Sequence, residues 1–169
     1  ENREKARVII NNAKILLTRE GKFGVIKTDA EFLRVFCGLL GDQLGLLHKV
    51  GYLYREENNA GGLDRKQNLT MSVELVDHDT GVFLERIGPR ERGLLLNQYL
   101  MGATCVPALY EVLNQLNPNE TSRVDIKELF SEYSSRYFSK ISILDRIKSR
   151  AILQDSLVAN KYIFQTCWG

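Results

Sequence analysis

The sequence predicts a mainly α-helical fold with small β-hairpins. Long segments carry apolar residues at helical spacing, proline or a Thr-Asp pair precedes several of them, and strand-like alternation is confined to short stretches. The 169 residues are 44% hydrophobic and 26% charged, which excludes an intrinsically disordered chain. A polar, glycine-containing loop at 57–68 predicts a division into an N-terminal helical unit, 1–60, and a second unit, 61–169.

The N-terminal unit is expected to contain helices and one short strand. Residues 2–17 have the spacing of an amphipathic helix, and 23–26 are expected to form a strand. Thr28 opens the next helix, with a glutamate at the capping-box position. Gly41 and Gly45 weaken this helix, so we expect a break near one of them. The same glycines also permit a neighbouring element to pack closely.

The second unit is expected to begin with a β-hairpin. Residues 71–84 alternate between apolar and polar around a glycine-containing turn, although a helix at 69–76 is the alternative. Each of the two following prolines is at a position typical of a helix start. The remaining elements expected are helices at 89–102, 107–116, 124–138 and 142–160, and a strand at 164–168.

Charge is distributed unevenly along the chain. The formal net charge is +2, but residues 133–169 carry six cations against two anions, a net +4 that leaves −2 for residues 1–132. Such asymmetry is typical of an end that faces phosphate, and a solvated helix face is the alternative.

Several functional classes are not expected. No apolar run has the roughly 18 to 20 residues of a membrane span, and no secretory signal is present. Three widely spaced cysteines without a CxxC motif argue against disulfides and structural zinc, and suit the cytoplasm or nucleus. Asp77, His78 and Asp79 precede a Thr-Gly pair and indicate a solvated turn more than a metal site. Neither His48 nor Cys105 has a catalytic partner in sequence, so no enzyme, metal or cofactor is expected.

The element order from residue 89 onward resembles the winged-helix and helix-turn-helix superfamily. Residues 124–138 would be the supporting helix, 142–160 the recognition helix and 164–168 the first wing strand. The resemblance covers about 80 residues and rests on element order, with no diagnostic motif. Residues 16–23 resemble the end of another such domain. Tandem units of this kind occur in the recognition parts of restriction and genome-defence proteins.

The resemblance implies a non-catalytic module of a larger protein that contacts duplex DNA through a basic helix. Arg146 and Arg150 share one face of that helix, and its apolar stripe, beginning at Ile143, Leu144 and Ile147, is expected to lie beneath. The first residue, Glu1, and the short last strand suggest a fragment. The residues expected to contact nucleic acid are Arg136, Lys140, Ser142, Arg146, Lys148, Ser149 and Arg150.

The alternative function is a protein-interaction or oligomerisation scaffold. In that case the apolar helices within 30–56 or 93–116 would dock a partner or a second copy of the chain.

Overall fold

The structure is a computed structural model that describes residues 2–19, 24–53 and 81–159, with side chains in the last helix described as far as Gln154. It confirms a mainly α fold with a small two-stranded sheet. The elements are α1 (Asn2–Arg19), α2 (Asp29–Val50), β1 (Tyr52–Leu53), β2 (Val82–Phe83), α3 (Pro89–Leu116), α4 (Pro118–Thr121), α5 (Ile126–Ser139) and α6 (Ile143–Ala159). Within these ranges, no helix is both long and apolar enough to span a membrane.

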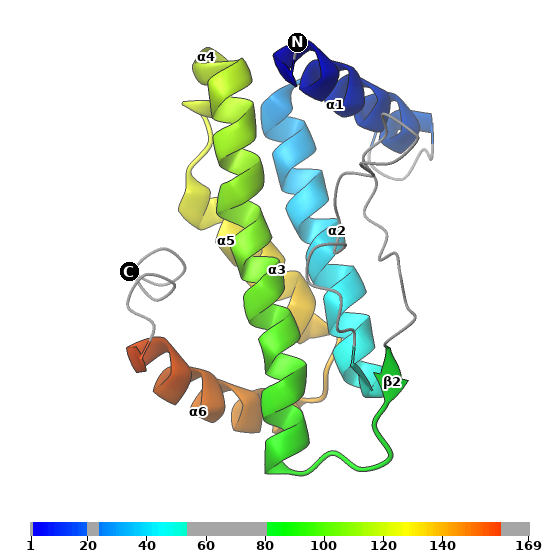
Figure 1. Cartoon of the computed structure of the whole chain (residues 1–169), viewed down its shortest axis with the longest axis vertical. Helices are drawn as coiled ribbons and strands as arrows, with labels where there is room; N and C mark the ends of the chain where they lie inside the picture. The colour runs from blue at the N-terminus through cyan, green and yellow to red at the C-terminus, as the bar shows by residue number, and fades with distance from the viewer. Residues whose placement is uncertain (1, 20–23, 54–80, 160–169) are drawn as a thin grey trace.

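The centre of the molecule is formed by α2, α3 and α5. Helices α2 and α3 run side by side in opposite directions, and α5 crosses behind them (Figure 1). Helix α1 lies across one end of this group, and α6 extends from the other end. The buried core draws on helices on both sides of residue 60, including Leu40 of α2, Leu96 of α3 and Phe130 of α5. The expected unit boundary itself lies outside the described residues.

Helix α2 is continuous, so the break expected near Gly41 or Gly45 is wrong. The expected capping box at Thr28 is confirmed, and Gly51 ends the helix in the left-handed conformation with φ 72°. The two internal glycines face α5. A Cβ atom added at Gly41 would overlap the carbonyl oxygen of Tyr133, and one added at Gly45 would lie 2.5 Å from that of Tyr137. The glycines therefore bring two backbones together without interrupting the helix.

Helix α3 is also continuous, although two helices were expected. Pro107 lies inside it instead of starting a new one. An internal proline costs a helix about 3 kcal/mol. Tyr99 before the expected break, Val106 within it and Leu109 after it are all buried, and their packing favours a single helix.

The small sheet only partly matches the expected strands. Val82 and Phe83 form a strand, as expected, but they pair antiparallel with Tyr52 and Leu53, in the register Tyr52↔Phe83 and Leu53↔Val82. The expected partner strand within 71–80 and the last strand, 164–168, lie outside the described residues.

The strand expected at 23–26 is wrong for residues 24–26, which the structure describes. The backbone N–H of Ile26 donates to Thr18 Oγ1 at 2.9 Å instead of joining a sheet. This bond gives the backbone N–H of the buried Ile26 an acceptor without a neighbouring strand.

We predict that Gly45→Ala lowers the free energy of unfolding by about 2 kcal/mol, because the new methyl group must push α5 away from α2. Chemical denaturation monitored by circular dichroism measures this change. Gly93→Ala is the matched control, since a Cβ there meets nothing within 4 Å. It should instead raise the free energy of unfolding, by about 0.5–1 kcal/mol. If both variants gained the same free energy of unfolding, the close approach of α5 at Gly45 would be contradicted.

Candidate functional site

The candidate site is formed by α5, α6 and the short connection between them. Asp125 caps α5 by accepting from the backbone N–H of Lys127 at 3.0 Å. Ser142 plays the same part for α6, because its Oγ accepts from the Asp145 N–H at 3.2 Å. Between the helices, the side chain of Ile141 is buried in the core. Capping by Ser142 and burial of Ile141 thus determine where α6 begins.

A chain of polar side chains attaches α6 to the helical core. Asp145 of α6 accepts from Arg92 Nε of α3 at 2.7 Å and lies 3.0 Å from His48 Nε2 of α2. His48 Nδ1 in turn lies 2.6 Å from the hydroxyl oxygen of Tyr137 of α5. An ionised carboxylate only accepts, so Nε2 carries the proton and Nδ1 accepts from the tyrosine. One residue from each of four helices takes part.

Burial keeps this histidine uncharged. The side chain of His48 has no exposed surface, and this burial lowers its pKa, with a smaller contribution from the nearby charge of Arg92. Asp145 opposes the shift but does not reverse it. Burial also raises the pKa of Tyr137 well above its ordinary value, so its hydroxyl remains a donor. The network at neutral pH therefore contains a neutral histidine between a tyrosine hydroxyl and a carboxylate.

The polar attachment turns the apolar stripe of α6 outward, contrary to the expectation that it lies beneath the helix. Ile143, Leu144 and Ile147 are 72%, 63% and 61% exposed. On the opposite face, Ser149 has no exposed surface and Leu153 is buried. The expected surface position of Ser149 is therefore wrong. The rotation of α6 follows from Asp145, which must point towards α2 and α3 to reach its partners.

A cleft of about 480 Å³ lies between α5 and α6. Hydroxyl groups from α5 line one side, and two arginines of α6 line the other. The lining residues are Phe130, Ser131, Ser134, Ser135, Phe138, Ser139, Arg146 and Arg150. The lining contains cations and hydroxyl donors but no acidic side chain, and this composition suits an anionic ligand.

Two buried polar atoms on α6 have no hydrogen-bond partner among the residues that the structure describes. They are Nε of Arg146, which lines the cleft, and Oγ of Ser149, which lies one turn further along the helix. A buried donor without a partner costs about 1–3 kcal/mol. Most buried polar atoms in proteins have a hydrogen-bond partner, either a protein group or an ordered water.

The other expected site residues have partners within the protein. Arg136 Nε donates to Asp42 at 2.9 Å, and Lys140 Nζ lies 3.3 Å from the same carboxyl group. Burial alone would raise the pKa of Asp42, but its hydrogen bonds and ion pairs with these two cations lower it. Ser142 serves as the cap of α6. Of the seven expected residues, Arg146, Lys148 and Arg150 remain as cations with no ion pair in the described part of the chain.

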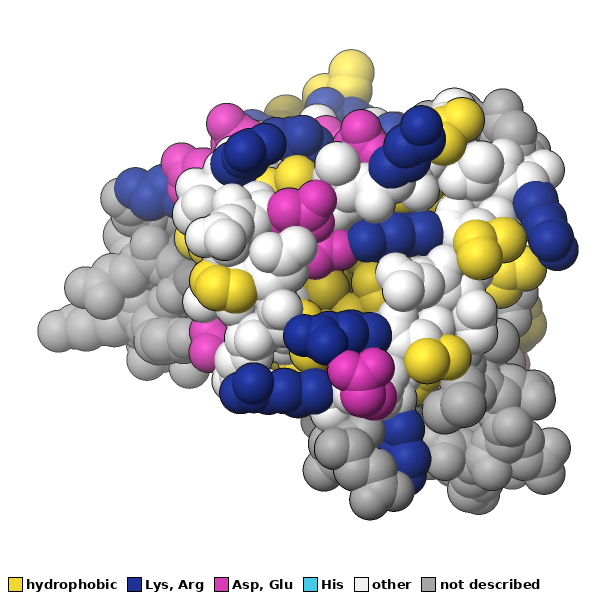
Figure 2. Space-filling view, turned by 90° about the horizontal axis from the view of Figure 1, so that it is seen from above, with side chains coloured by type: hydrophobic (Ala, Val, Ile, Leu, Met, Phe, Trp, Pro, Cys, Tyr) yellow, Lys and Arg dark blue, Asp and Glu magenta, His cyan; other side chains and the backbone are white. Residues whose placement is uncertain are grey.

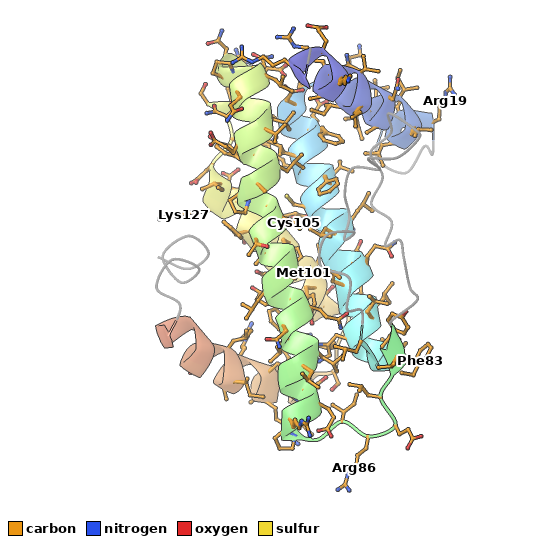
Figure 3. All side chains as sticks on the ribbon, in the orientation of Figure 1. Arg19, Phe83, Arg86, Met101, Cys105 and Lys127 are labelled. Atoms are coloured by element: carbon orange, nitrogen blue, oxygen red, sulfur yellow. The ribbon has the colours of Figure 1, made fainter. Side chains whose placement is uncertain are left out.

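The opposite end of the molecule has a mixed charge. Figure 2 shows cationic and acidic side chains interspersed on the face that carries α1 and α4. A hollow of about 340 Å³ there is lined by both signs, including Lys14, which forms an ion pair with Asp29. Arg19, at the end of α1, and Arg86, before α3, extend into solvent (Figure 3). The cleft between α5 and α6 is thus distinguished by its single sign of charge.

The described cysteines are unsuited to nucleophilic chemistry. Cys37 is buried in the core, and this burial raises its pKa to about 12. Cys105, in the middle of α3 (Figure 3), also has a pKa raised by burial. Within the described ranges, no three His, Cys, Asp or Glu side chains gather as metal ligands. The turn expected at 77–79 lies outside these ranges.

Comparison with protein-family models, with curated proteins and with solved structures finds no match to this chain.

We predict that the protein loses stability as the pH falls from about 7 to about 5. The folded state lowers the pKa of His48 below its ordinary value of 6.5, so the unfolded chain takes up the proton first. Asp145, Arg92 and Tyr137 are the charged and titratable groups that face it. Urea denaturation at each pH, compared with His48→Gln, measures the effect. The glutamine variant should show a flatter dependence, and identical pH profiles would contradict this role of His48.

Proposed function

We propose that this chain is a non-catalytic module that binds nucleic acid through the phosphate backbone, at the cleft between α5 and α6. The observation that carries the proposal is the cleft itself, which combines two arginines with four serine hydroxyls and has no acidic lining residue. Guanidinium groups and hydroxyls are the side chains that most often contact phosphate oxygens. Lys148 is a third exposed cation of α6, but it lies beside Leu144 on the outer face of the helix and does not line the cleft.

The chemistry of α6 favours phosphate contact over the reading of bases. A helix that enters the major groove places polar or basic side chains against the base edges. The outward face here carries Ile143, Leu144 and Ile147 together with Lys148, whereas Arg146 and Arg150 line the cleft. We therefore assign affinity to phosphate contacts, and expect little sequence preference.

The local architecture is compatible with the resemblance to winged-helix proteins. Helices α5 and α6 follow one another after a three-residue connection, 140–142. This arrangement supports our proposal that the two helices belong to a helix-turn-helix unit of a larger protein. The free thiols of the buried Cys37 and the half-buried Cys105 suit a reducing compartment, in keeping with a cytoplasmic or nuclear location.

We predict that replacing Arg146, Lys148 and Arg150 together by alanine weakens DNA binding. If each cation contacts one phosphate, the affinity falls by about tenfold per residue. The slope of log K against log salt concentration becomes less steep by about 0.7–0.9 per residue. Fluorescence anisotropy of labelled DNA across a salt series measures both quantities.

The matched control removes the same charge from Arg3, Arg19 and Arg123, which are exposed and outside the cleft. This control should keep nearly the wild-type salt slope. Equal losses in the two triple variants would point to net charge alone, and an unchanged affinity in the variant of Arg146, Lys148 and Arg150 would refute the proposed interface.

A second function, protein interaction or oligomerisation, is favoured by the apolar ridge of α6, which we define as Ile143, Leu144 and Ile147. Neighbouring exposed apolar side chains on one helix are typical of docking surfaces. The helices first expected to dock a partner, within 30–56 and 93–116, direct most of their described apolar side chains into the core. The candidate surface thus moves to α6.

We predict that, if the ridge joins two copies, the wild-type mass measured by light scattering rises with concentration. Replacing Ile143 and Ile147 together by glutamate should leave a monomer, because two buried charges without partners are costly. The control is the double glutamate variant at Val8 and Val25, which are exposed apolar residues outside α6. A monomeric wild type at every concentration would exclude self-association.

A further inference from the structure

The cleft between α5 and α6 is recessed, and this shape restricts the form of nucleic acid that it fits. A volume of about 480 Å³ lies within the range of sites that hold one small molecule. The major groove of a duplex is itself about 12 Å wide and receives a protruding helix. A recess between two helices instead suits one strand or one phosphate at a time.

The surface that would protrude towards a duplex is the apolar ridge. Ile143, Leu144 and Ile147 project from the outer face of α6, where a duplex would have to approach the helix. Lys148 is exposed beside this ridge, but the three apolar side chains on the same face would remove water from phosphates without supplying hydrogen bonds in return. The arginines that could compensate, Arg146 and Arg150, lie on the side of the helix that faces the cleft.

Polar groups repeat along both walls of the cleft. Ser131, Ser135 and Ser139 are four residues apart on α5, which places successive hydroxyls about 6 Å apart along the helix. Arg146 and Arg150 have the same spacing on α6. Ser139 already donates to the Arg136 carbonyl oxygen at 2.7 Å. Its neighbours Ser131 and Ser135 have no hydrogen bond within the described residues and are exposed. A regular row of donors of this kind matches a ligand whose anionic groups also repeat.

The aromatic residues of the cleft argue for binding through the backbone of the strand. Phe130 and Phe138 line the cleft but are only 2% and 5% exposed. Single-strand-binding proteins commonly stack bases on exposed aromatic rings. Because these two rings are almost covered, the strand would be held by its phosphates and sugars, with its bases directed away from the cleft floor.

We propose that the cleft between α5 and α6 receives a single polynucleotide strand in preference to a duplex, held by the serine row of α5 and the arginine pair of α6. This inference rests on the proposed nucleic-acid function and specifies the ligand class of the same site. Its salt dependence would follow the shallower single-strand relation, a slope of about −0.7 per contacted phosphate.

The test compares a labelled single-stranded oligonucleotide with a duplex of the same sequence and length, by fluorescence anisotropy on the wild-type chain at low salt. We expect the single strand to bind at least about tenfold more tightly. A second single strand of unrelated sequence should bind about equally well, because phosphates carry no sequence information.

Two serine variants locate the binding to the cleft. Ser135→Asp places a negative charge among the cleft hydroxyls and should weaken single-strand binding by about tenfold or more. Ser122→Asp makes the same charge change at an exposed position outside the cleft and should leave the affinity almost unchanged. Circular dichroism of both variants checks that the fold is retained.

The outcomes separate the two proposals. If neither the single strand nor the duplex binds at low salt, the proposed nucleic-acid function fails. If the duplex binds as tightly as the single strand, or if Ser135→Asp and Ser122→Asp have the same effect on a folded protein, the single-strand inference fails while nucleic-acid binding stands.

Discussion

The close contact between α2 and α5 at Gly41 and Gly45 is the constraint from which the rest of the architecture follows. The contact places the backbone carbonyl of Tyr137 against α2, so that its hydroxyl reaches His48 one helical turn further on. His48 is then in place to meet Asp145, which orients α6. The absence of a Cβ atom at Gly41 and at Gly45 thus helps to decide which face of α6 is presented to solvent.

Much of the fold could be predicted because its signals are local. The extent of α1, the capping box at Thr28 and the start of α3 at Pro89 each depend on residues within one or two turns of one another. The same is true of α5 and α6, whose order along the chain led to the expectation of paired helices with a short connection. Helical spacing and capping residues are sufficient to place such elements.

The errors arise where distant residues decide the outcome. Apolar side chains on α6 were expected to face inward, but Asp145 meets residues 97 and 53 positions away and turns them outward. Arg136 was expected to be available for phosphate, but Asp42, 94 positions away, binds it. Pro107 was taken as a helix start, although packing along α3 outweighs its cost. A single sequence gives no direct sign of these pairings.

The manner in which α6 is attached has a consequence for its dynamics. Its ridge residues remain in water whether or not the helix is docked, so among its described side chains, as far as Gln154, hydrophobic burial on docking falls mainly to Leu153 and its half-buried neighbour Ile152. The described part of the helix is also attached by the polar network around Asp145. We expect a helix held in this way to open without global unfolding. Its amide hydrogens would exchange with solvent well before those of α2 and α5.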